Sequence, residues 1–213
     1  MKWTYLMLGG LALGALTTAC DNDPSADKVK AVSNPAAAQP APAAKQGAVE
    51  YKFDAKNSSL AFVGAKVTGK HEGSFQTFSG SVQLVDRRPE QSTVKVEIDM
   101  GSVQVEPEKL EGHLKSPDFF DVAKYPKASF ESTSVKPGGA EGATHTVTGN
   151  LTLHGVTRSI SFPASIQVNG DTLTVKAEFA INRKDFGIVY PGMPDDLIKD
   201  DVLIQLKLGA NRS

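Results

Sequence analysis

The side chains that could do chemistry are few in this sequence, which has four His and one Cys among 213 residues. His71 stands beside Glu72, but no second residue follows at the spacing of a metal ligand. His113 could act as a base only with a nucleophile within hydrogen-bond reach. The sequence has no Gly-x-Ser-x-Gly elbow and no Gly-rich phosphate loop. We therefore predict a protein that is not an enzyme, without catalytic residue, metal or cofactor. A hydrolase with His113 or His71 as base is the weaker alternative.

Two groups of charged residues near the C-terminal end of the chain admit more than one interpretation. The four aspartates in residues 195–201 could bind calcium, but they lack the spacing of a calcium loop, which favours a solvated acidic rim. Arg183 and Lys184 could meet a phosphate head group, or they could form ion pairs at a strand edge. The net charge of −1 gives no electrostatic basis for binding nucleic acid.

The first twenty residues are typical of a secretory leader that ends in a cysteine. Residues 3–16, "WTYLMLGGLALGAL", are apolar but shorter than the about 20 residues needed to span a bilayer. The next residues, "TTAC", resemble a bacterial lipobox, in which the cysteine is acylated and becomes the mature N-terminus. We predict a signal peptide over 1–19 and lipidation of Cys20. The protein would then lie at the periplasmic face of a cell-envelope membrane, or be periplasmic or secreted if Cys20 is not lipidated.

Residues 20–48 differ in composition from the rest of the chain. They contain "NPAAAQPAPAAKQGA" and no aromatic residue. Such a segment buries too little apolar surface to offset the entropy lost on ordering. We predict a disordered tether between Cys20 and the folded domain.

Residues 49–211 are long enough for one domain and alternate polar with apolar residues. "VKVEIDM" at 94–100, "DTLTVKAEFAIN" at 171–182 and "DVLIQLKL" at 201–208 each present one apolar face. A period of two residues is typical of half-buried antiparallel strands. The Asn-Gly pair within residues 168–171 predicts a hairpin. The pattern predicts an all-β domain of about eight strands, as a barrel or a sandwich.

One stretch within this domain departs from the alternation. Acidic residues after an early proline, followed by two leucines four apart, predict one short helix near 106–116. The helix leads into "SPDFFDVAKYP" at 116–126, which holds three aromatic rings in an irregular segment. Phe119, Phe120 and Tyr125 would either line the opening of a barrel or close its core.

Several segments together resemble the YceI family and stand in the order found in that family: "GSFQTFSGSV" (73–82), "VKVEIDMGSV" (94–103), "GHLKSPDFFDVAKYPKASFEST" (112–133), "VTGNLTLHGVTRSISF" (147–162) and "INRKDFGI" (181–188). The resemblance implies a lipocalin-like, eight-stranded antiparallel barrel. Members of the family are secreted or periplasmic and are described as binding polyisoprenoid or related amphipathic lipids. No catalytic residue comes with the resemblance.

The function expected from the residues and the resemblance is a membrane-tethered protein that carries or sequesters an isoprenoid-type lipid inside an apolar barrel. A structural or partner-binding envelope module with a filled core is the main alternative, and a homodimer is possible. The predicted ligand-binding residues are apolar and face inward if the register holds: Phe62, Phe78, Val96, Ile98, Phe119, Phe120, Phe130, Leu151, Leu153, Phe162, Val175, Phe179, Ile204 and Leu206.

Overall fold

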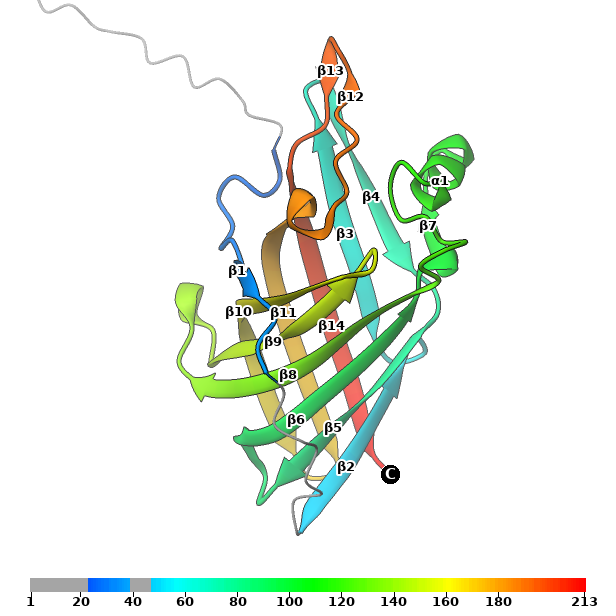
Figure 1. Cartoon of the computed structure of the whole chain (residues 1–213). Coiled ribbons are helices and arrows are strands. Elements are labelled where there is room, and N and C mark those ends of the chain that lie inside the picture. Colours follow the sequence, from blue (N-terminus) through cyan, green and yellow to red (C-terminus); the bar gives the residue numbers. More distant parts are fainter. Residues whose placement is uncertain (1–22, 39–46) are drawn as a thin grey trace, which may run out of the picture.

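The long strands form an antiparallel barrel (Figure 1). Because side chains alternate between the two faces of a strand, the apolar residues of each long strand share one face, which lies toward the inside. The computed structural model describes residues 23–38 and 47–213. Eight strands close the barrel, in this spatial order: β2 (Ala48–Asp54), β5 (Phe78–Val85), β6 (Arg88–Asp99), β8 (Lys127–Pro137), β9 (His145–Leu153), β10 (Val156–Asn169), β11 (Thr172–Asn182) and β14 (Asp201–Arg212). The predicted all-β class and the eight-stranded antiparallel barrel are confirmed.

Shorter elements complete one end of the barrel: β3 (Ser59–Lys66), β4 (Gly69–Phe75), η1 (Met100–Ser102), β7 (Val103–Val105), α1 (Glu108–Lys115), η3 (Arg183–Phe186), β12 (Gly192–Met193) and β13 (Asp196–Leu197). One more 3-10 turn, η2 (Ala140–Gly142), joins β8 to β9. β14 changes partner along its length, because residues 203–207 pair with β3 whereas Asn211 and Arg212 pair with β2. β3, β4, β7 and α1 therefore replace β2 as the wall of one half of the barrel.

Aromatic rings lie over glycines of neighbouring strands where the wall curves. A Cβ atom added at Gly73 would lie 2.4 Å from Cζ of Phe62, and one added at Gly149 would lie 2.4 Å from Cζ of Phe130. Phe62 and Gly73 are direct cross-strand partners on β3 and β4. Glycine at these positions lets the ring fold down over the neighbouring strand.

Buried apolar side chains gather in the end of the barrel near the β10–β11 turn. Its residues form one cluster, in which each is at most 5% exposed: Tyr51, Phe53, Phe78, Val82, Leu84, Leu173, Leu208 and Ala210. Leu173 opens β11, and Leu208 and Ala210 lie toward the end of β14. We call this cluster the filled end.

The segment predicted to be a disordered tether differs from that prediction in its described part. β1 (Val32–Pro35) pairs antiparallel with residues 158–161 of β10. The Asn150 side chain makes two hydrogen bonds to the backbone of Ala37, at 3.0 and 2.8 Å. The prediction of disorder is wrong for these residues, because composition reports what a segment can bury and not whether a neighbouring strand offers it free backbone groups.

β10 has a free edge because its pairing with β11 is limited to residues 165–169 of β10 and 172–176 of β11. Beyond that point the first half of β10 has no partner on this side other than β1. Ala31 donates its N–H to the Ala180 carbonyl at 2.8 Å, and Ala180 donates to Val29 at 2.9 Å. Residues 29–35 therefore fill a gap in the wall between β10 and β11.

The local predictions of helix and hairpin agree with the structure. The one α-helix of the described residues is α1, within the predicted 106–116 region. The Asn-Gly turn joins β10 to β11, and Gly170 has the positive φ of +60° that such a turn requires. None of the helices in residues 23–38 and 47–213 is long and apolar enough to cross a membrane.

Candidate ligand-binding cavity

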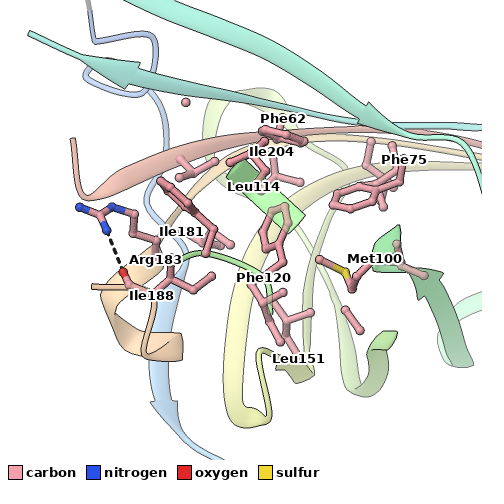
Figure 2. A pocket seen from close by; sticks show the side chains of 18 of the residues that line it. Phe62, Phe75, Met100, Leu114, Phe120, Leu151, Ile181, Arg183, Ile188 and Ile204 are labelled. Atoms are coloured by element: carbon pink, nitrogen blue, oxygen red, sulfur yellow. Dashed lines mark hydrogen bonds between the residues drawn. The ribbon is translucent and has the colours of Figure 1, made fainter. Parts of the chain in front are cut away.

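The half of the barrel walled by β3, β4, β7 and α1 encloses a cavity of about 580 Å³. This volume lies within the range of about 300–1,000 Å³ that is common for small-molecule sites. The lining is apolar almost throughout, and its side chains come from the inner faces of the strands and from the segment around α1 (Figure 2). Such a space suits a hydrocarbon ligand, because water in it would find few hydrogen-bond partners.

All of the predicted ligand-binding residues except Phe78 line this cavity. They come from β3, β6, β8, β9, β10, β11, β14 and the segment after α1, so the alternation placed the right face inward on distant strands. Phe78 also points away from solvent, but it packs within the filled end. The prediction that Phe78 lines the cavity is therefore wrong. The period of two gives the face of a strand on which a side chain lies, but not its level along the barrel. Contact with a ligand stays a prediction for all of them.

Three phenylalanine rings from separate elements meet in the cavity. The centroid of Phe62 lies 5.7 Å from that of Phe75 and 6.5 Å from that of Phe120, and Phe75 and Phe120 are 6.0 Å apart. Figure 2 shows Phe120 pointing into the space among Phe62, Phe75 and Leu151. Offset and edge-to-face arrangements of this kind are favourable for aromatic pairs.

The remaining rings of the 116–126 segment have other roles. Phe119 lies 5.4 Å from Tyr190 and 5.0 Å from His113, so it fixes α1 against the connection that follows η3. Tyr125 covers Gly155 and contacts His154 at 4.8 Å, which closes the turn between β9 and β10. The two sequence alternatives therefore both apply: Phe120 lines the cavity, Tyr125 closes packing, and Phe119 does both.

The polar residues of the cavity gather where it opens to solvent. Lys109 on α1 is exposed, and Lys66, His71 and His113 are half-buried. His71 Nδ1 lies 3.2 Å from the Glu106 carbonyl. We call this group of residues the mouth. It lies between α1 and the turn that joins β3 to β4.

The mouth contains both histidines, His113 and His71, that the hydrolase alternative would use as a base. His113 Nε2 lies 3.0 Å from a carboxylate oxygen of Asp118, and both His113 and His71 line the cavity. Among the described lining residues there is no Ser, Thr or Cys, so neither histidine has a protein nucleophile to activate there.

Arg183 lies at the edge of the cavity, but its guanidinium is committed to the backbone. It is 5% exposed and donates to the Ile188 carbonyl at 2.8 Å (Figure 2). It also donates to the carbonyls of Lys199 at 3.1 Å and Ile198 at 3.4 Å. Burial lowers the pKa of Arg183, an effect that Asp200 opposes. Of the two alternatives raised for this residue, ion pairing fits the geometry, because Nη2 of Arg183 pairs with Asp200 at 3.3 Å and the backbone contacts leave little of the guanidinium for a phosphate.

Three of the four aspartates of 195–201 form ion pairs. Asp196 forms an ion pair with Lys66, Asp200 with Lys184, and Asp201 with Lys30. No three His, Cys, Asp or Glu side chains in the described part of the chain come together as a metal site would require. The interpretation of these residues as a charged rim therefore fits the geometry better than a calcium loop.

Several lining residues were not singled out from the sequence. Val105 lies on β7, where alternation would have found it. Leu110 lies on α1, and its spacing to Leu114 served to predict the helix but was not used to place it in the cavity. Ile188 and Ile198 lie on irregular connections, where no period marks the inner face. Cys20, the predicted lipidation site, lies outside the described residues.

Comparison with known proteins places this cavity in context. A family model described as a YceI-like domain matches residues 51–210. A UPF0312 protein of Pseudomonas putida (strain W619) is 34% identical over 168 residues, which cover 74% of this chain and 86% of the relative. Protein YceI of Salmonella arizonae is 37% identical over 153 residues, which cover 66% of this chain and 77% of the relative.

Solved structures share the fold. BcnA of Burkholderia cenocepacia superposes with a TM-score of 0.65 at 27% identity, over 75% of this chain and 99% of its own. A polyisoprenoid binding domain from Saccharophagus degradans superposes with a TM-score of 0.61 at 17% identity, over 78% of this chain and 99% of its own. The second likeness supports the fold alone.

Proposed function

Because this chain belongs to the YceI-like family, we propose that its barrel carries or sequesters an isoprenoid-type lipid in the cavity described above. The observation that carries the proposal is the hollow, apolar half of the barrel, lined by Phe62, Phe120, Phe162 and Phe179 and open at the mouth. A solved polyisoprenoid binding domain has the same fold, and the proposal takes its ligand class from that likeness of fold.

The free energy gained by burying a hydrocarbon ligand exceeds the cost of binding it only above a certain chain length. Each buried carbon contributes about 0.8 kcal/mol, so one five-carbon unit contributes about 4 kcal/mol. Association and ordering cost roughly 4–15 kcal/mol. A ligand of one unit would bind too weakly to be useful, whereas several units would bind well. The proposal therefore specifies a lipid with several isoprene units, whose polar head stays near the mouth.

Native mass spectrometry of the protein purified from its own cells tests the proposal directly. We expect an additional mass that organic solvent releases and that fragments as an isoprenoid. A protein without bound lipid, which also takes up no added polyprenyl lipid, would contradict the proposal and favour an envelope module that binds partners through its surface.

A pair of variants on one strand connects the lipid to the cavity. Phe179 lines the cavity and stacks on Phe162, with centroids 4.1 Å apart and an angle of 12° between the rings. Phe179→Asp places a carboxylate among apolar side chains, and we expect lipid binding to be lost. Thr174→Asp, on the outer face of the same strand, is the matched control and should bind lipid normally. A folded Phe179→Asp protein that binds lipid as the control does would place the lipid elsewhere.

We further propose that Cys20 is acylated and holds the barrel at the periplasmic face of a membrane. Support comes from the sequence, in which an apolar leader precedes the only cysteine of the chain. The intact mass of the mature protein should correspond to residues 20–213 plus acyl chains, and Cys20→Ser should abolish the added mass. A mature protein that starts elsewhere, or that carries no acyl chain, would contradict the anchor without affecting the lipid-binding proposal.

A further inference from the structure

The exposed large hydrophobic side chains of the described residues are concentrated near the mouth. Val67, Val189, Met193 and Leu197 are 57%, 63%, 61% and 50% exposed, and the fifth such residue, Val32, lies on β1. Val67 is in the turn between β3 and β4. Met193 and Leu197 lie on the β12–β13 hairpin, and Val189 precedes this hairpin in the chain. We call these four residues the apolar tip. The upper end of Figure 1 shows the hairpin projecting beyond the barrel, beside the β3–β4 turn.

The apolar tip is held in place by polar contacts beneath it. Val67 donates its N–H to the Leu197 carbonyl at 3.1 Å. Thr68 donates its N–H and its hydroxyl to Asp196 at 3.0 and 2.9 Å, and Lys66 pairs with the same carboxylate. These contacts join the turn to the hairpin, so the apolar side chains project from a braced platform. The platform adjoins the mouth, because Lys66 and Ile198 both line the cavity.

The N-terminal segment reaches the same end of the barrel. Lys30 pairs with Asp201, which is the first residue of β14 and lies opposite Asn182, the last residue of β11. Figure 1 shows the described chain starting at the end that carries β12 and β13. The sequence before residue 23 contains the apolar run of residues 3–16 and Cys20. Cys20 is three residues from Asp23, a contour length of about 10 Å.

We propose that the apolar tip docks on a lipid bilayer and turns the mouth of the cavity toward it. Three observations on one end of the molecule point to the bilayer: exposed apolar side chains, the opening of an apolar cavity, and a chain that arrives there after a membrane-seeking sequence. The purpose of this docking rests on the proposed function, because a lipid could then pass between the membrane and the cavity without crossing water. The docking itself has its own test.

The contact with the bilayer is apolar and not electrostatic. The charged side chains around the tip form pairs with one another: Lys66 with Asp196, Lys70 with Glu72, and Lys184 with Asp200. Asp195 adds an exposed carboxylate on the hairpin. The tip therefore offers no net positive charge to anionic lipids, and we expect docking to be as strong on phosphatidylcholine as on mixtures with phosphatidylglycerol.

Site-specific fluorescence on the full chain measures the orientation. Met193→Cys and, at the far end of the barrel, Asp171→Cys each receive a thiol-reactive fluorophore, and the wild-type chain serves as the blank for labelling of Cys20. The labelled proteins are reconstituted through their own N-terminus in phosphatidylcholine vesicles that contain a nitroxide-labelled lipid. We expect strong quenching at position 193 and little at position 171.

Three other results would contradict the docking proposal. Weak quenching at both positions would mean that the tethered barrel does not dock, and stronger quenching at position 171 would mean that the opposite end faces the bilayer. Burial of the fluorophore at position 193 without vesicles, growing with protein concentration, would mean that a second copy covers the tip. Quenching at position 193 in a protein that carries no lipid would support docking and contradict the proposed function alone.

The rate of lipid transfer to vesicles gives a second readout. Replacing Met193 and Leu197 with Asp removes two apolar side chains from the tip, and we expect transfer to slow by at least about tenfold. Val32→Asp removes an equally exposed apolar side chain away from the tip and should transfer lipid at the normal rate. Equal rates for the tip variant and this control would overturn a role of the tip in transfer.

Discussion

Phe78 and Phe179 both point into the barrel from strands with the same alternating pattern, but they meet different surroundings. Phe78 packs among Tyr51, Val82 and Leu84 in the filled end, whereas Phe179 faces an open cavity. The difference follows from the wall. In the filled end, β2 pairs with β14 and the circuit of eight strands is tight, whereas toward the mouth β3, β4, β7 and α1 take its place.

Whether a region of this barrel is hollow therefore depends on how the strands of its wall are arranged, and not on the residue types that line it. Large apolar side chains, Phe, Val and Leu among them, occur in both regions, and the cavity wall adds Ile. In the filled end these side chains are at most 5% exposed. In the wider half aromatic rings also meet, as Phe162 and Phe179 do, but a cavity of about 580 Å³ remains, and Leu208 at the edge of the filled end lines it.

The sharpest way to test the comparison is to shorten one leucine in each region. Leu84 is 1% exposed in the filled end, and Leu84→Ala leaves a new void there, so we expect the free energy of unfolding to fall by about 2–5 kcal/mol. Lipid affinity should not change, because Leu84 does not line the cavity. Chemical denaturation and lipid titration measure the two effects.

Leu151 is the matched position in the cavity wall, where the space beside the side chain is already open. Leu151→Ala enlarges an existing cavity, so its cost should be smaller than that of Leu84→Ala, at roughly 1–2 kcal/mol. Its lipid affinity should fall. If Leu84→Ala weakened lipid binding as much as Leu151→Ala did, the division into a filled end and a cavity would be wrong.

The ring of Phe120 tests which part of the aromatic segment serves the ligand. It is half-buried, contacts Phe62 and Phe75, and points into the cavity. Phe120→Ala removes contact area mainly from the ligand, so we expect an affinity loss of about tenfold and a small change in stability. Tyr125→Phe keeps the ring over Gly155 and should leave lipid affinity unchanged. An unaltered affinity in Phe120→Ala would place the lipid away from the rings of Phe62, Phe75 and Phe120.

The sequence was sufficient for some levels of this structure and not for others. Alternation on β6, β11 and β14 predicted the strands and their inner faces, because burial on one side of a sheet leaves a local period. Phe78 shows the limit: its inward direction was readable, but its level along the barrel depends on which strand β14 pairs with. Ile188 and Ile198 were missed because irregular backbone carries no period.

The N-terminal segment was missed for a different reason. Residues 29–37 have the composition of a linker, and only the gap between β10 and β11 makes them a strand. Such pairing is set by the backbone of other elements, which are distant in sequence. A segment held in this way by few contacts is expected to open more readily than the filled end.

Asn150 provides the test of that expectation. Its amide makes both hydrogen bonds to Ala37, and Asn150→Ala removes them at a cost of about 1–2 kcal/mol to the segment. Hydrogen exchange of residues 29–37 should accelerate by about tenfold or more, while exchange in the filled end stays the same. Thr152→Ala on the same strand, whose hydroxyl bonds Thr157, is the control and should leave the segment protected. Equal acceleration in both variants would mean that the segment is not held through Asn150.

The smallest effect is expected from pH, and it separates the apolar tip from the filled end. The hydrogen bond from Lys66, with those from Thr68, lowers the pKa of Asp196. The folded state therefore favours the ionised carboxylate, and this contribution to stability is complete above the ordinary aspartate pKa of about 3.9. It is lost as the pH falls through the lower pKa of the folded state. Exchange of residues 66–68 and 196–198, corrected for intrinsic rates, should accelerate only in acid, whereas the apolar filled end should not respond. In Asp196→Asn, which keeps an acceptor for Thr68 without the charge, this acid response should be absent. If the response persisted, the ion pair of Asp196 with Lys66 would not be its source.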